Sequence, residues 1–295
     1  MPRIPLPDHL RRAPFTSQQG LAAGLGRKRM AGADIQNPFH GTHTAADLTH
    51  LELCRTLVTR MPSDAFFSGV TAASLRGVPL PRRHERQLPL HVSVPYPRHA
   101  PRGRGVAGHS VVVDVSQLES FGDLRVSGPA RMWCELGAVL ELSDLVAAGD
   151  FITHWRQPLA SLSELMDAAE RFPGRIGART RRLALTLIVD RSESPAESRL
   201  RVVLVRGGIR DLVANFAIVT SGGYRYRADL AIPSKKIIIE YQSDLHLTRE
   251  SYGRDRTRIS RLTADGWLVI EVTALDLANP EELVRRIQRH LASRG

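Results

Sequence analysis

The sequence predicts a mixed α/β protein, α+β overall, and three observations support this class. Short β-branched runs such as Ile237-Ile238-Ile239 are typical of strands, and apolar residues at helical spacing, as in residues 162–169, are typical of helices. From residue 191 onward these patterns follow the order helix, three strands, helix, strand, helix. A chain of 295 residues with 42% hydrophobic content suits a globular protein of two domains or one large one.

Residues 1–45 are expected to form a small N-terminal module. A helix is expected within residues 16–25, and the segment Arg27-Lys28-Arg29 is expected to form a basic turn into a second helix, with a short strand after it. This order is that of a winged helix-turn-helix, which would place the three basic side chains against DNA. A basic arm with one helix fits the same residues.

Residues 46–150 are expected to form a mixed α/β region. Helical spacing predicts a helix at 51–58 and another at 70–75, which Gly77 is placed to end. Pro and Gly predict an exposed basic loop at 95–108. The other expected elements are strands at 90–94, 110–115 and 124–127, a helix from Pro129 through Trp133, and a helix capped by Ser143 that reaches Ala148.

Residues 151–190 are expected to be a helical connector. Its two helices, at 162–169 and 179–188, are separated by Pro173-Gly174. Four arginines are expected to form a mainly exposed basic surface there: Arg175, Arg179, Arg181 and Arg182.

Residues 191–295 form the last expected domain. Its first helix has a defined start, with Ser194 as the N-cap, Pro195 at the first position and Glu197 at the third, which predicts a capping box. The elements expected after it are strands at 213–219, 224–232 and 236–241, a helix at 249–264, a strand at 267–272 and a closing helix from Asn279.

Two carboxylates in this domain stand out. Asp229 and Glu240 lie on neighbouring expected strands around the turn at Pro233-Ser234, so their Cβ atoms are expected about 5 Å apart. Buried carboxylates that close together repel unless a cation lies between them, so we hypothesise a divalent metal. Two alternatives stay open, a salt bridge from Asp229 to Arg225, Arg227 or another arginine, and an ion pair of Glu240 at a sheet edge.

The C-terminal motifs resemble a known family. The element order, with RADLAIPSKKIIIEYQSDLH, RDRTR and GWLVIEV, resembles the PD-(D/E)XK restriction-endonuclease-like superfamily, and more closely the domain of very-short-patch-repair endonucleases. Upstream, VTAASLRGVPLP, LHVSVP, VSGPARMWCELG and LSDLVAAGD are similar to abortive-infection type IV antitoxins. Together these likenesses imply a region that recognises DNA followed by a domain that cuts it.

The resemblance also implies roles for single residues. Asp229 and Glu240 would hold Mg²⁺ or Mn²⁺, and Glu197 resembles the helix glutamate that completes such sites, although its cap already gives it a structural task. Gln242 stands where the superfamily has lysine; it can orient a water molecule but supplies no positive charge. His246 would act as general acid or base, or bind phosphate, and a surface histidine is the alternative.

Two arginines of the 249–264 helix match the family's Arg-Asp pattern. Arg254 and Arg258 are expected to line one edge toward the phosphate, while Asp255 pairs with Arg258. Many nucleases of this type cut both strands as dimers, which leaves a homodimer open.

The charge of the chain favours a polyanionic partner. The formal net charge is +11, and the basic residues are arginines except for Lys28, Lys235 and Lys236. We expect DNA, with RNA left open. The sequence has no apolar run of membrane-helix length and no signal-peptide pattern, so the expected location is the cytoplasm. The expected function is a metal-dependent DNA endonuclease in repair or phage defence, and the alternative is a DNA-binding regulator of the antitoxin type.

Overall fold

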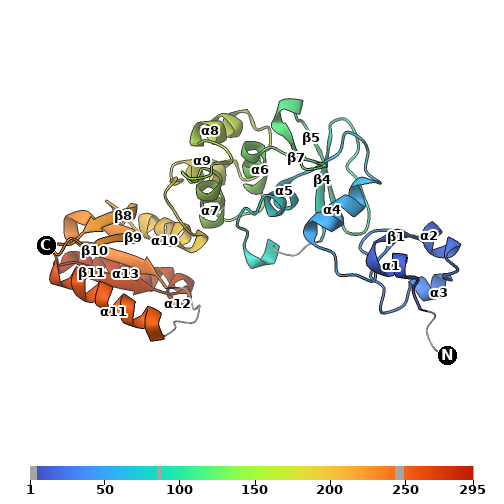
Figure 1. Ribbon diagram of the computed structural model, residues 1–295. Helices are drawn as coiled ribbons and strands as arrows, with labels where there is room; N and C mark the ends of the chain where they lie inside the picture. Colours follow the sequence, from blue (N-terminus) through green and yellow to red (C-terminus); the bar gives the residue numbers. More distant parts are fainter. Residues whose placement is uncertain (1–4, 85–87, 243–248, 295) are drawn as a thin grey trace. The chain divides into compact units, whose positions relative to one another are not determined.

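The fold is mixed α/β, as predicted (Figure 1). A computed structural model describes residues 5–84, 88–242 and 249–294, without the side chains of 249–255. Within these ranges, no helix has both the length and the apolar character needed to cross a membrane. The chain divides into two compact units, Met1–Leu136 with Arg171–Gly174, and Gly137–Glu170 with Arg175–Gly295. This division differs from the four segments expected from composition.

The first part of unit 1 is a small helical module with a two-stranded sheet. Its elements are α1 (Asp8–Arg12), β1 (Phe15–Thr16), α2 (Ser17–Ala22), α3 (Arg27–Met30) and β2 (Thr42–His43). The strands pair antiparallel, and Phe15 packs with Leu10, Leu25 and Met30 in a local core. The expectation of a basic turn was wrong, because Arg27, Lys28 and Arg29 themselves form the helix α3.

A five-stranded sheet forms the rest of unit 1, in the order β5-β4-β3-β7-β6. Its strands are β3 (Phe66–Phe67), β4 (Leu90–Pro95), β5 (Val106–Val111), β6 (Leu118–Phe121) and β7 (Leu124–Ser127), and the helices are α4 (His50–Val58), α5 (Gly69–Leu75) and α6 (Pro129–Leu136). Gly77 follows α5 with a φ of 70°, as expected for a residue that ends a helix. The strand expected at 110–115 was misplaced, because β5 begins in the expected loop, and β6 was missed.

Unit 2 opens with a group of helices. They are α7 (Leu142–Ile152), α8 (Leu162–Arg171), α9 (Ala178–Leu185) and α10 (Pro195–Arg206), of which α7 packs against both α9 and α10. The predicted cap at Ser143 was wrong, since α7 already includes this residue and Glu141 stands at the N-cap. Arg181 was also wrongly placed on the surface: it is buried and donates to the carbonyl of Ile176, whereas its three arginine neighbours are exposed.

A buried ion pair joins α7 to α10. Asp150 and Arg201 are each almost fully buried, and Arg201 Nη2 lies 2.6 Å from Asp150 Oδ2. The backbone N–H of Val189 also donates to Asp150 at 2.8 Å. Removing one partner of such a pair leaves an uncompensated buried charge, so the pair fixes the position of α10 on the helices before it.

The sheet of unit 2 has the order β11-β10-β9-β8. Its elements, with the helices that follow, are β8 (Val213–Val219), β9 (Arg225–Ile232), β10 (Ile237–Tyr241), α11 (Arg249–Ala264), β11 (Leu268–Val272), α12 (Ala274–Ala278) and α13 (Pro280–Ala292). Strand β10 runs antiparallel to β9 and parallel to β11. The expected order helix, three strands, helix, strand is therefore observed from α10 to β11, and α12 is an addition.

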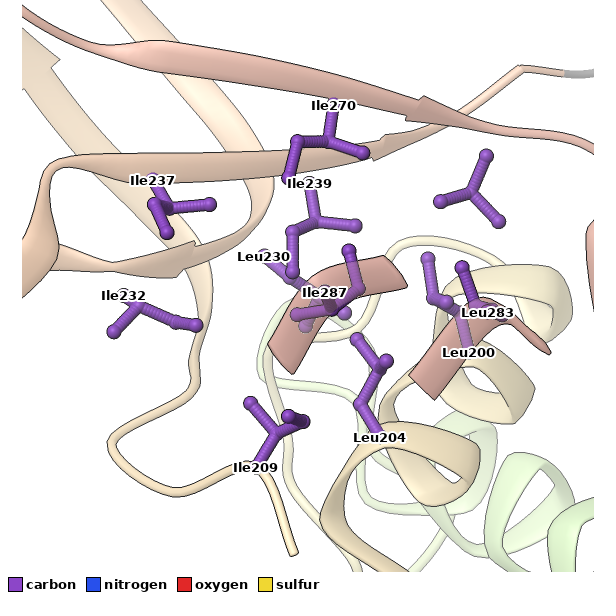
Figure 2. Close-up of a cluster of buried hydrophobic side chains, with 11 residues drawn as sticks. Leu200, Leu204, Ile209, Leu230, Ile232, Ile237, Ile239, Ile270, Leu283 and Ile287 are labelled. Carbon is purple, nitrogen blue, oxygen red and sulfur yellow. The ribbon is translucent and has the colours of Figure 1, made fainter. Parts of the chain in front are cut away.

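Helices cover both faces of this sheet, which explains the run of three isoleucines in β10. Ile237 and Ile239 belong to a core cluster with α10 and α13, whereas Ile238 packs with Leu262 of α11 on the other face. Figure 2 shows the first cluster, whose labelled residues include Leu200 and Leu204 of α10, Leu283 and Ile287 of α13, and Leu230, Ile239 and Ile270 of the sheet. Because each face is covered, a polar residue in β10 must find its partner inside the protein.

Candidate functional site

The β9–β10 hairpin brings the two predicted carboxylates together. The strands pair with Ile237 opposite Ile232 and Ile239 opposite Leu230. One further pair in the same register places Asp229 across from Glu240, as the sequence suggested. The backbone pairing of β9 with β10 ends at this point. The backbone N–H of Tyr241 donates instead to the side chain of Asp229, 2.9 Å from Oδ2.

Glu240 is buried against a cation that the protein itself supplies. Only 6% of the residue is exposed, and Arg258 of α11 donates from both terminal nitrogens, with Nη1 2.6 Å from Glu240 Oε2 and Nη2 on Oε1. Arg258 Nη2 also donates to the carbonyl of Arg227 at 3.3 Å. The ion pair therefore lies between an inner strand and a helix, and not at a sheet edge. Asp255, the expected partner of Arg258, has its side chain outside the described part of the protein.

Asp229 is a half-buried carboxylate, and its described hydrogen-bond donor is the backbone N–H of Tyr241. Burial raises its pKa, while the Tyr241 N–H and the charge of Arg258 oppose the shift. The alternative of a salt bridge to Arg225 or Arg227 is not observed among the described residues, since Arg227 lies 3.8 Å from Glu193 instead. Asp229 therefore keeps a proton more readily than an exposed aspartate does.

Glu197 of α10 is the third carboxylate of this group. Burial is the largest cause of its raised pKa, and the negative charge of nearby Asp229 contributes to the rise. Ser194 caps the helix as predicted, accepting the N–H of Glu197 at 3.2 Å. The capping box is only half formed, because Glu197 Oε2 accepts the N–H of Glu193, 3.0 Å away, and not that of Ser194.

These carboxylates supply the kind of oxygen ligand that a hard divalent cation prefers, but in this structure Glu240 does not face a metal site. Mg²⁺ and Mn²⁺ prefer oxygen ligands, and Glu197 and Asp229 supply them near one another. Both oxygens of Glu240 are bound by Arg258, so Glu240 must exchange this partner to reach a metal. Within the described ranges, no group of three or more His, Cys, Asp or Glu side chains is arranged to hold a metal ion.

Gln242 contacts a carboxylate that the sequence did not suggest. Its Nε2 donates to Glu271 Oε1 of β11 at 3.0 Å, and Glu271 is paired in register with Glu240. The amide is thus oriented along the sheet toward β11. No signal in the sequence predicts this contact, because it depends on the parallel pairing of β10 with β11.

The remaining predicted site residues either lie in α3 of unit 1 or have side chains outside the part of the chain that the structure describes. His246 lies outside the described residues, and so does the side chain of Arg254. Arg27 and Lys28 are exposed on α3, whereas Arg29 binds both carboxylate oxygens of Asp34, at 3.0 and 2.7 Å. Of the three basic side chains expected at DNA, Arg29 therefore has a structural task.

Comparison with known proteins gives distant relatives. No family model matches the chain. Two uncharacterized proteins of Mycobacterium tuberculosis, MT2308 of strain CDC 1551 / Oshkosh and Rv2248 of strain H37Rv, are each 30% identical over 172 residues, which are 57% of this chain and 64% of theirs. The match thus spans slightly less than two thirds of the length of these relatives. The crystal structure of the RV2827C protein from Mycobacterium tuberculosis is 19% identical with a TM-score of 0.38, over 64% of this chain and 74% of that one.

Proposed function

We propose that unit 2 is a metal-dependent endonuclease domain that hydrolyses phosphodiester bonds in DNA. The proposal rests mainly on the position of three acidic side chains from three different elements. Asp229 of β9 lies across from Glu240 of β10 where the β9–β10 ladder ends, and its charge acts on Glu197 of α10. Grouped buried carboxylates cost free energy, and such groupings are most common where a cation or a reaction uses them.

A bound Mg²⁺ or Mn²⁺ would neutralise charge on the scissile phosphate and lower the pKa of a bound water molecule. Asp229 and Glu197 would hold this ion, with Glu240 joining after it exchanges Arg258. Gln242 would orient water through its amide, which already makes a directed hydrogen bond. The guanidinium of Arg258, which binds two carboxylate oxygens here, suits two phosphate oxygens equally well.

The test is cleavage of supercoiled plasmid by the full chain in Mg²⁺ or Mn²⁺, with DNA binding measured in parallel. Asp229→Asn and Glu240→Gln should each lower the cleavage rate by about 100-fold or more while DNA binding remains. Glu282→Gln on α13, a partly exposed carboxylate outside the group, serves as the control and should cut normally. Equal cutting by Asp229→Asn and the unmodified protein would exclude this site as the source of activity.

The ion pair between Glu240 and Arg258 supports a second candidate function. Its negative charge is already balanced by Arg258, and Gln242 supplies no cation where the resembled superfamily has lysine. A domain that had lost its chemistry would keep such an ion pair for stability and bind DNA as a regulator. DNA binding without cutting in either metal, for the native chain and for Arg258→Gln, would favour this function.

A further inference from the structure

A groove in unit 1 lies between the N-terminal module and α4. Its volume is about 870 Å³, and its lining includes the start of α2, the turn before β2 and one side of α4. Three arginines from separate segments line it: Arg12 at the end of α1, Arg55 in α4, and Arg60 just after α4. We call this cavity the α2–α4 groove.

Positive charge is in excess in this groove. Among the described residues that line the groove, Glu52 is the only carboxylate, and it accepts the N–H and the hydroxyl of Thr49, both at 2.7 Å. Arg55 contacts Asp123, which is outside the lining, and half of the Arg55 side chain stays exposed. With Asp123 counted as the partner of Arg55, three guanidinium groups still exceed two carboxylates, and one of these, Glu52, is already held by its own helix cap.

The floor of the groove holds one of these guanidinium groups in place. Arg60 Nη1 donates to the carbonyl of His40 and to Thr42 Oγ1, the second at 3.1 Å. Gly41 lies beside it with a φ of 68°, and a Cβ there would lie 3.6 Å from Arg60 Nη1. The left-handed backbone favours glycine at this position, and a Cβ there would make only ordinary van der Waals contact with the Arg60 guanidinium.

We propose that the α2–α4 groove binds the phosphate backbone of duplex DNA. Arginine binds phosphate oxygens with two parallel hydrogen bonds, and three separated arginines suit successive phosphates better than one small anion. Exposed Arg27 and Lys28 on α3 and the net charge of +11 extend the positive character of the chain beyond the groove. Positive charge that continues beyond the groove favours a long polyanion over a short acidic peptide. The inference does not depend on cleavage by unit 2.

The test is fluorescence anisotropy of a labelled DNA duplex with the full chain, in EDTA and over a range of salt concentrations. EDTA prevents metal-dependent cutting, so the measurement is unaffected by failure of the proposed nuclease activity. Arg12→Gln/Arg55→Gln should weaken binding by about tenfold or more and reduce the slope of log K against log salt by about 2, one for each lost phosphate contact. Thr59→Glu, which adds a negative charge to the groove wall and keeps every arginine, should also weaken binding.

The matched control is Arg206→Gln/Arg285→Gln, which removes the same charge from exposed positions in unit 2. It should change the salt slope by less than half as much as the groove variant. Thermal unfolding of all the proteins checks that each is folded. An equal loss for groove and control variants, or normal binding by Thr59→Glu, would overturn the proposal.

Discussion

At the scale of single residues, Arg258 determines whether the carboxylate of Glu240 is available to a metal ion. Its guanidinium holds both oxygens of Glu240, and its charge also lowers the pKa of Asp229 against the effect of burial. Arginine stays charged at any pH that a protein tolerates, so Arg258 acts as a permanent cation at this point. Metal binding at Glu240 and this ion pair therefore exclude one another.

Arg258→Gln should destabilise the protein by about 3–5 kcal/mol, because Glu240 is left buried without its cation. Urea unfolding measures the change. The double variant Glu240→Gln/Arg258→Gln should recover much of this loss, since no uncompensated charge remains. A single variant as stable as the native protein would mean that Glu240 finds water or another partner.

Asp229→Asn should show a stability change that depends on pH. Burial raises the pKa of Asp229, so the folded state binds its proton more tightly than the unfolded state does. The free energy of unfolding therefore falls as pH rises through the folded-state pKa. Below the unfolded-state pKa of about 3.9, Asp229 is protonated in both states and causes no such penalty. Asparagine removes this penalty, so the variant should be more stable than the native protein at pH 7 and gain nothing below about pH 4.

The control for this prediction is Asp265→Asn. Hydrogen bonds from the hydroxyl and N–H of Ser221 lower the pKa of Asp265, so its carboxylate favours folding above the unfolded pKa. This variant should lose stability at pH 7, the opposite sign to Asp229→Asn. If both variants changed stability in the same direction at pH 7, the assigned environment of Asp229 would be wrong.

At the scale of elements, local signals predicted most helices and strands of unit 2. The bounds of β8 and α11 match the expected ones, because a short, mostly apolar strand segment and a long polar helix each have their own local pattern. Helix α12 is only five residues long, too short for a periodic pattern, and the sequence did not predict it. Arg181 could not be placed either, since its burial depends on how the chain packs around it.

Two serines test the capping signals directly. Ser194→Ala should cost about 1 kcal/mol, because the Ser194 hydroxyl accepts the N–H of Glu197 at the start of α10. Ser143→Ala should change stability by less than half as much, since Ser143 lies inside α7 and not at its cap. Chemical unfolding compares the two, and equal losses would mean that the cap of α10 contributes nothing specific.

At the scale of the whole molecule, the sequence predicted the hairpin but not how the site is completed. The turn at Pro233-Ser234 and the strand composition on both sides of it were enough to place Asp229 opposite Glu240. The docking of α11, which brings Arg258 to Glu240, and the pairing of β11, which brings Glu271 to Gln242, are long-range contacts. A local pattern carries no information on such contacts, so the sequence left an ion pair of Glu240 open but did not predict Arg258 as its partner.

The central claim is that Glu197, Asp229 and Glu240 form one site for a divalent cation, and titration of the protein with Mn²⁺ tests it most directly. Electron paramagnetic resonance measures free Mn²⁺ during the titration. We expect one bound ion in the native chain, bound more tightly as pH rises because the raised pKa values of Asp229 and Glu197 make protons compete with the metal. Binding should be lost in Glu197→Gln/Asp229→Asn and kept in Glu282→Gln. Equal Mn²⁺ binding by the native chain and the double variant, or none by the native chain, would contradict the claim.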